Sequence, residues 1–186
     1  IEFSDSICIK NIGGLMLNEK IISLMNEQIN KEFYSAYLYL DFANYYESKG
    51  LEGFASWFKI QAKEEQDHGM LFYQYLQNNN ACVKFDPIDA PSYKIQDLIT
   101  PLKESLKHEK FVTSCINKIY SAAEDFMDYR SMEFLNWFIK EQAEEECSAQ
   151  ALITKAEFLG NDAKGFYLLD KELLAREYSA PDYSFD

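Results

Sequence analysis

Four long helical segments each carry polar side chains in the middle of an otherwise apolar stripe. Apolar residues in these segments recur at alternating spacings of three and four, as the core of a helix bundle requires. The inward stripes comprise Ile22, Met25, Ile29, Glu32, Ala36, Tyr39 and Ala43; Phe54, Phe58, Gln61, Glu65, His68, Phe72 and Tyr75; Leu102, Ser105, Glu109, Val112, Ile116, Ile119, Ala123 and Phe126; and Leu135, Phe138, Gln142, Glu145, Ala149, Leu152 and Ala156. Buried carboxylates are costly unless they are paired or bind a metal. The pattern therefore predicts a metal site inside a four-helix bundle.

Length and charge narrow the class of protein. A chain of 186 residues is most simply one domain with a sizeable core. The formal net charge of −13 argues against a nucleic-acid partner, because the phosphate backbone requires a basic surface. No uninterrupted apolar run approaches the ~18–20 residues of a membrane span. The four cysteines form no CxxC pair, which excludes a rubredoxin-like iron site or zinc knuckle and suits a reducing cytoplasm.

The sequence pattern changes near the N-terminus, between residues 1–15 and the helical pattern that begins at Met16. Residues 1–15 are aperiodic and include the pair Gly13-Gly14, whereas Met16 opens a helical pattern at once. We expect residues 1–15 to be a vector-derived or otherwise non-core extension, with Met16 as the natural start. Residues 16–186 would then form the folded domain.

The spacing of breakers predicts five helices. They are expected at residues 18–46, 51–76, from 97 or 100 to 124, from an N-cap at Asp128 to 158, and, for a shorter one, at 163–177, followed by a loose tail at 180–186. The non-periodic stretch 79–97 can span at most ~60 Å. A helix of about 26 residues is only roughly 39 Å long. Helices two and three can therefore lie parallel, joined by one crossover along the bundle.

The clearest chemical motif is Glu-x-x-His at Glu65 and His68. Residues three apart on a helix share a face, so one carboxylate and one imidazole can hold one metal. Alone the motif is weak, but the other three stripes carry polar residues at matching depth, namely Glu32, Glu109, Gln142 and Glu145. Tyr39 lies seven residues after Glu32 on the same face. Oxygen ligands with one imidazole suit iron better than a structural zinc site, which favours thiolates and imidazoles.

The sequence closely resembles the non-haem bacterial ferritins over essentially all of residues 16–178. The resemblance is carried by the segments 26–32 (NEQINKE), 62–68 (AKEEQDH), 107–109 (KHE), 134–138 (FLNWF), 141–146 (EQAEEE) and 170–173 (DKEL). It implies an all-α, ferritin-like four-helix bundle with a long crossover between helices two and three. It also implies a hollow homo-oligomeric shell of twenty-four subunits, in which the short fifth helix packs around the four-fold axes.

The resemblance further implies a ferroxidase centre that takes two to three iron ions per subunit. Glu32, Glu65 and His68 match its first iron site, with Glu65 as the bridge. The second site would comprise Glu109 and Glu145, with Gln142 nearby and Tyr39 beside the centre. A third site would comprise Glu64, Glu141, Glu144 and Glu145. The implied activity is oxidation of Fe(II) to Fe(III) by O2 or H2O2, followed by storage as a ferric oxide mineral.

Departures from neighbouring families exclude some cofactors. Haem-containing bacterioferritins carry a second Glu-x-x-His, but here Glu145 is followed three residues later by Ser148. Their haem-ligating Met would fall at Gln66, so we expect no haem. A rubrerythrin would add a cysteine-rich iron module, which the sequence lacks.

Alternatives remain open at this stage. A storage subunit without ferroxidase activity would lack the carboxylates that this chain carries. A di-iron oxidase or peroxide reductase would usually show Glu-x-x-His twice. The acids Glu64, Glu141 and Glu144 could also form a plain charged face. His108 lies one step off its stripe and is expected at the surface.

Overall fold

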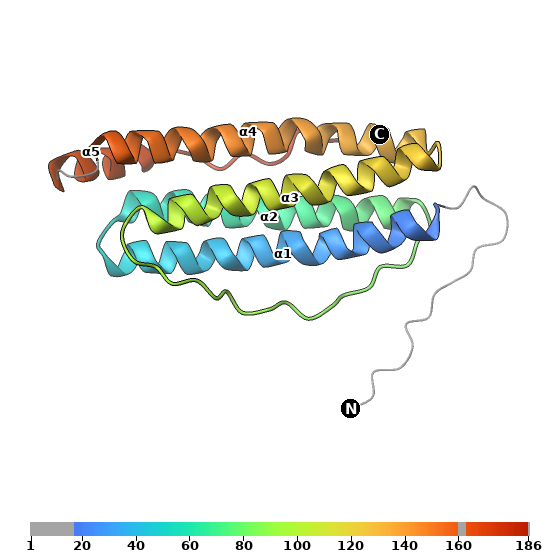
Figure 1. Cartoon of the computed structure of the whole chain (residues 1–186), viewed down its shortest axis with the longest axis horizontal. Helices are drawn as coiled ribbons and strands as arrows, with labels where there is room; N and C mark the ends of the chain where they lie inside the picture. Colours follow the sequence, from blue (N-terminus) through green and yellow to red (C-terminus); the bar gives the residue numbers. More distant parts are fainter. Residues whose placement is uncertain (1–16, 160–162, 186) are drawn as a thin grey trace, which may run out of the picture.

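The computed structural model describes residues 17–159 and 163–185, which contain five helices and no strand (Figure 1). The helices are α1 (Glu19–Ser48), α2 (Glu52–Asn78), α3 (Thr100–Asp125), α4 (Tyr129–Leu159) and α5 (Ala163–Leu173). This confirms the expected all-α bundle with a short fifth helix, although α5 ends four residues earlier than predicted. The expected N-terminal extension, residues 1–15, lies outside the described part of the chain.

Local signals in the sequence account for several helix ends. The Asn18 side chain accepts a hydrogen bond from the Lys20 N–H (2.8 Å) and so caps α1. Gly50, with φ of 72°, makes the turn into α2, a conformation that glycine adopts without steric cost. Before α3, the Asp97 carboxylate accepts a hydrogen bond from the Thr100 N–H (2.7 Å). These caps satisfy amide groups that the helices themselves leave unpaired.

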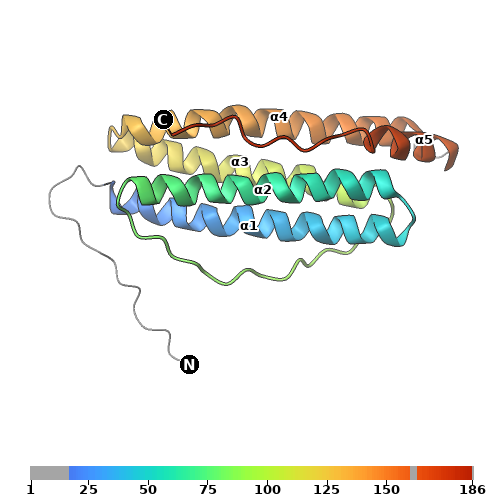
Figure 2. The same ribbon diagram turned by 180° about the vertical axis from the view of Figure 1, so that it is seen from behind.

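The topology has one long crossover. The segment between α2 and α3 returns along the whole length of the bundle, so α2 and α3 run in the same direction (Figures 1 and 2). The remaining connections between helices are short. This arrangement confirms the prediction made from the length of the non-periodic stretch.

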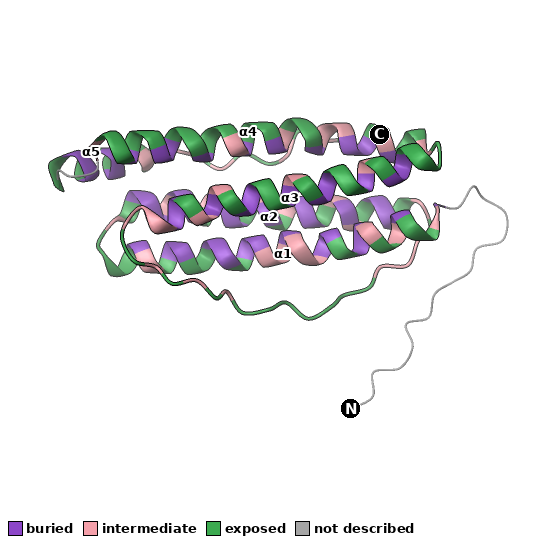
Figure 3. Cartoon of the chain, in the orientation of Figure 1, coloured by how far each residue is buried: buried purple, intermediate pink, exposed green. Residues whose placement is uncertain are grey.

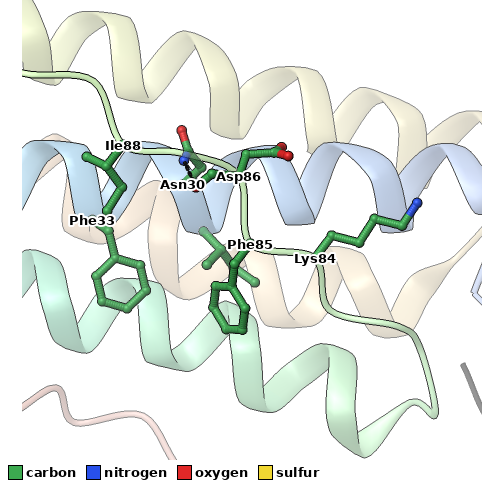
Figure 4. A pocket seen from close by; sticks show the side chains of 7 residues that line it. Asn30, Phe33, Lys84, Phe85, Asp86 and Ile88 are labelled. Carbon is green, nitrogen blue, oxygen red and sulfur yellow. Dashed lines mark hydrogen bonds between the residues drawn. The ribbon is translucent and has the colours of Figure 1, made fainter. Parts of the chain in front are cut away.

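Two asparagines of α1, one helical turn apart, fasten the crossover to the bundle. Asn26 accepts a hydrogen bond from the Lys84 N–H (2.7 Å), and Asn30 donates one to the Asp86 carbonyl (3.1 Å). Beside Asn30 the crossover and α1 enclose a small pocket (Figure 4). Its apolar lining comes from Ile29, Phe33, Phe85 and Ile88. An otherwise irregular segment is thereby held at a fixed height against α1.

Burial follows the predicted stripes, which face the interior of the bundle (Figure 3). The apolar core falls into two clusters, one around Phe42 and Phe58 and the other around Phe72 and Phe138. One member of the predicted third stripe is misplaced: Phe126 is 50% exposed, because α3 ends at the preceding residue. Within the described helices, none is long and apolar enough to cross a membrane.

The C-terminal tail is ordered against the bundle rather than loose. Beyond α5 the chain turns back and runs along α2 and α4 (Figure 2). The Trp137 indole donates a hydrogen bond to the Asp182 carboxylate (2.7 Å), and the rings of Tyr183 and Phe185 pack on Phe134. The prediction of a loose tail is therefore wrong for residues 180–185, since aromatic side chains of the tail find partners on α4.

Candidate metal centre

A layer of polar side chains separates the two apolar clusters at mid-height of the bundle. On every long helix, the residues of one cluster end before this layer and those of the other cluster begin after it. The layer consists of Glu32 from α1, Glu65 and His68 from α2, Glu109 from α3, and Gln142 and Glu145 from α4. Each of these residues is at most 7% exposed. The polar interruptions of the four stripes therefore meet at one place.

Two fully buried groups of ligand atoms share one carboxylate. Glu32, Glu65 and His68 form one group, and Glu65, Glu109 and Glu145 form the other. Within each group, one ligand atom from every residue lies within 4.8 Å of the others. Such separations fit coordination of one cation per group, with Glu65 placed between two cations. The described residues thus offer two adjacent candidate positions for a cation.

Many polar atoms of this layer have no protein partner. Both carboxylate oxygens of Glu65, one oxygen each of Glu32 and Glu145, and Nδ1 of His68 are buried without a hydrogen bond among the described residues. The His68 Nδ1 atom lies 3.7 Å from the nearer Glu65 oxygen, too far for a good hydrogen bond. Buried polar groups in proteins are otherwise nearly always satisfied. Cations bound between these atoms would satisfy them.

The raised pKa values of the buried carboxylates also favour a bound cation. Burial, reinforced by neighbouring carboxylates, raises the pKa of Glu65 and of Glu145 well above its usual range. Burial also raises the pKa of Glu32, although the nearby His68 opposes the rise. Without a cation, these groups therefore tend to hold protons. A cation entering the centre would displace those protons.

Amide side chains orient two of the carboxylates. Gln142 donates a hydrogen bond to the Glu109 carboxylate (3.2 Å), and Gln28 donates one to Glu32 (2.8 Å). These contacts occupy one oxygen of each acid and fix its direction. Gln28 is fully buried and was missed by the sequence reasoning. Its position four residues before Glu32, on the same helix face, was the available signal.

Tyr39 lies at the edge of the centre. Its hydroxyl donates a hydrogen bond to the Glu109 carboxylate, and its ring packs 5.8 Å from the ring of Phe58, centroid to centroid. Burial, followed by the charge of Glu109, raises the pKa of Tyr39 well above its usual range. The side chain is therefore a neutral phenol whose oxygen touches a candidate ligand.

The three outer acids of the predicted third site are not brought together as a group. Glu141 is half-buried and lies 3.9 Å from Nε2 of His68, and the two form a further group with Glu145. Glu144 is exposed. Glu64 bonds to the guanidinium of Arg176 at 2.7 Å instead. Among the described residues, neither Glu64 nor Glu144 belongs to a group of three ligands.

His108 does not lie at the surface, so that prediction is wrong. It is 6% exposed, and its Nε2 atom lies 2.7 Å from the Ser35 hydroxyl of α1. The ring also packs edge-on against Tyr39, with centroids 6.1 Å apart. The stripe of α3 is wider than the alternating pattern suggested, because α1 contacts this neighbouring position as well.

Comparisons of this chain with known proteins identify one family. The family model of the ferritin-like domain matches residues 22–159. The chain is 35% identical over 158 residues to a probable bacterial non-heme ferritin-like protein of Haemophilus influenzae, covering 85% of this chain and 96% of the relative. It is also 35% identical over 164 residues to the bacterial non-heme ferritin of Staphylococcus epidermidis, covering 88% and 99%.

Solved structures agree with the sequence relatives. An engineered closed form of the Archaeoglobus fulgidus ferritin superposes with a TM-score of 0.85 at 35% identity, covering 88% of this chain and 99% of that one. An open pore ferritin from the same archaeon superposes with the same TM-score, at 35% identity and with 87% and 98% coverage. Fold, length and sequence thus converge. The chain belongs to the ferritin family, among relatives of the bacterial non-haem type.

Proposed function

We propose that this protein is an iron-storage ferritin whose subunit oxidises Fe(II) to Fe(III) at the buried centre. The observation that carries the proposal is the position of Glu65, which belongs to both of these ligand groups and whose two oxygens find no hydrogen-bond partner among the described residues. One carboxylate shared by two cation positions is what a pair of neighbouring iron ions requires. Hard oxygen ligands with a single imidazole also stabilise the higher charge of Fe(III).

In this proposal each residue has a defined task. Glu32 and His68 hold the first Fe(II) ion, Glu109 and Glu145 hold the second, and Glu65 bridges them. Gln142 and Gln28 keep the ligands oriented through their hydrogen bonds. The two ions together give up two electrons, which reduce O2 to H2O2, or H2O2 to water, with uptake of two protons. The Tyr39 hydroxyl, bonded to Glu109, is placed to donate a hydrogen bond or an electron during this step.

Storage requires a compartment, and we propose a homo-oligomeric shell of twenty-four subunits in the cytoplasm. Relatives are named ferritins, and the solved neighbours are an open pore and a closed form of one ferritin. Large apolar residues also remain exposed on α1 of the single chain, including Tyr37 at 54% and Leu40 at 43%. Apolar residues at these positions favour a contact with another subunit. Ferric ions leaving the centre would mineralise inside this shell.

The proposed metal content is two iron ions in the centre and a third beside Glu141 and Glu145, without haem. Support for the absence of haem comes from Gln66, an exposed amide at the position where the haem-binding relatives carry methionine. The intact ligand groups argue against a subunit without ferroxidase activity. The single Glu-x-x-His argues against a di-iron oxidase acting on another substrate.

The test is addition of Fe(II) without oxygen, followed by air, with the ferric absorbance recorded for wild type and Glu65→Ala. We expect rapid oxidation of at least two irons per subunit in the wild type and its near-complete loss in the variant. Glu157→Ala, which removes an exposed acid from α4, is the control and should behave as wild type. Slow oxidation of equal rate in all three proteins would contradict a ferroxidase centre. Sedimentation of the same samples reports whether the hollow particle forms.

A further inference from the structure

The C-terminal segment, residues 174–185, runs along α2 and α4 on the outside of the bundle (Figure 2). It contacts α2 at Glu64 and Asp67, through Arg176 and Tyr178 respectively. It contacts α4 at Trp137, through Asp182. The segment is therefore attached to both helices, and one of its contacts is the outer acid Glu64. We call it the C-terminal strap.

Arg176 is the part of the strap that reaches the acids. Its Nη2 atom lies 2.7 Å from an oxygen of Glu64, and its guanidinium lies over the Trp57 ring, 5.1 Å from the centroid. Both side chains are largely shielded, with 29% of Arg176 and 16% of Glu64 exposed. Burial raises the pKa of Glu64, and the charge of Arg176 opposes that rise. The guanidinium thus acts as the counter-ion of this acid.

Glu64 is also electrostatically part of the centre. Its charge interacts with His68 and Glu141, and it contributes to the raised pKa of Glu145. An additional cation held by Glu64 and Glu141 would lie next to the Arg176 guanidinium. Two positive groups that need the same carboxylate compete for it, and their repulsion in a partly buried site is strong. Binding of such a cation therefore requires Arg176 to move.

The contact between Arg176 and Glu64 is weak enough to be broken. One guanidinium nitrogen of Arg176, Nη1, is buried and makes no hydrogen bond within the described residues. The contact with Glu64 is thus a single charged hydrogen bond rather than a bidentate pair. Also on α2, the Tyr178 hydroxyl bonds to Asp67 and its ring packs under Lys63, while on α4 the strap is attached through Asp182.

From these contacts we propose that the C-terminal strap is a gate on the outer cation position, with Arg176 bound to Glu64 in place of a metal ion. The outer position binds a divalent cation only when Arg176 leaves Glu64, whereas the two central positions are filled independently of the strap. This inference rests on the proposed function, because it presumes that the central groups bind metal. It also explains why Glu64 stands apart from the ligand groups.

The experiment is a calorimetric titration of the whole protein with Zn²⁺, which binds to oxygen and imidazole ligands without redox chemistry. Wild type should bind two ions per chain tightly and a third only weakly. Arg176→Gln should bind the third ion at least tenfold more tightly, and Arg176→Lys, which keeps the charge, should stay close to wild type. Glu64→Gln combined with Arg176→Gln should lose the gain. Lys155→Gln removes an exposed ion pair of α4 with α5 and is the matched control.

Hydrogen exchange of residues 174–185 gives a second readout. If the strap is a gate, exchange should rise when Zn²⁺ fills the third position of the wild type, and it should be raised in Arg176→Gln before any metal is added. Equal third-ion affinity in wild type and Arg176→Gln, with unchanged exchange, would overturn the gate while leaving the central site intact. Loss of the proposed function would look different, because Glu65→Gln would then fail to weaken the first two binding events.

Discussion

Replacing Glu65 by glutamine should stabilise the metal-free protein, although it removes the central ligand. Glu65 is 1% exposed, and in the part of the chain that the structure describes neither of its oxygens has a hydrogen-bond partner. It lies within 4.8 Å of ligand atoms of Glu32 on one side and of Glu109 and Glu145 on the other. Glutamine has nearly the same shape as a protonated glutamate and carries no charge. The substitution therefore removes the electrostatic conflict without creating a cavity.

The size of the effect follows from the proton that Glu65 must hold. Its pKa is raised well above the ordinary value of 4.5 by burial and by the neighbouring carboxylates. At pH 7 the unfolded chain has released this proton, whereas the raised pKa makes the folded apo protein hold it more tightly. Each unit by which the folded pKa exceeds 4.5, up to the working pH of 7, costs about 1.4 kcal/mol, so the upper limit of the loss is roughly 3–4 kcal/mol. Glutamine removes this cost, and a domain of this size gains about 2–4 °C for each kcal/mol.

Thermal unfolding in excess chelator at pH 7 measures the change. We expect Glu65→Gln to melt several degrees above wild type without metal and below it when Zn²⁺ is saturating, because the variant lacks the bridging ligand. Glu157→Gln, at an exposed position of α4, should leave both transitions nearly unchanged. At pH 4.5 the advantage of Glu65→Gln should largely vanish, since the unfolded chain then also holds the proton about half of the time. A variant that melts below wild type in chelator at pH 7 would refute the reasoning, because Glu65 would then be making a stabilising contact.

Three further predictions test other parts of the structure. Because the buried carboxylates of the centre have raised pKa values in the folded state, the metal-free protein should lose stability as the pH rises above 4.5 through those values, and saturating Zn²⁺ should abolish the loss in thermal melts. Gly53→Ala should destabilise the protein by about 2–4 kcal/mol in chemical denaturation, with Glu52→Ala as the control. A Cβ atom at Gly53 would lie 1.7 Å from the Asp170 carbonyl oxygen, and the displaced Asp170 would lose its hydrogen bonds to the start of α2. Tyr39→Phe should slow Fe(II) oxidation in stopped flow while Zn²⁺ still binds at two sites per chain, because the bond to Glu109 is lost but the ligands remain. An unchanged oxidation rate would show that Tyr39 takes no part in Fe(II) oxidation.

Part of this protein can be derived from the sequence because the relevant signals are local. The spacing of apolar residues identifies the inward face of each helix, and the interruptions of that pattern are the residues that meet in the polar layer. The length of the irregular segment between α2 and α3 is sufficient for these helices to run parallel. Such signals depend only on helix geometry and chain length, which are the same in any surroundings.

Other features arise only when the helices pack. The sharing of Glu65 between two ligand groups depends on the rotation of α2 relative to the other three helices. His108 is buried because α1 covers a position beside the stripe of α3. Arg176 reaches Glu64 across 112 residues of sequence, through a tail with no helical pattern to indicate its path. Sequence determined which residues face inward, whereas the tertiary structure decided their partners, because contacts between distant segments depend on how those segments dock rather than on any local repeat.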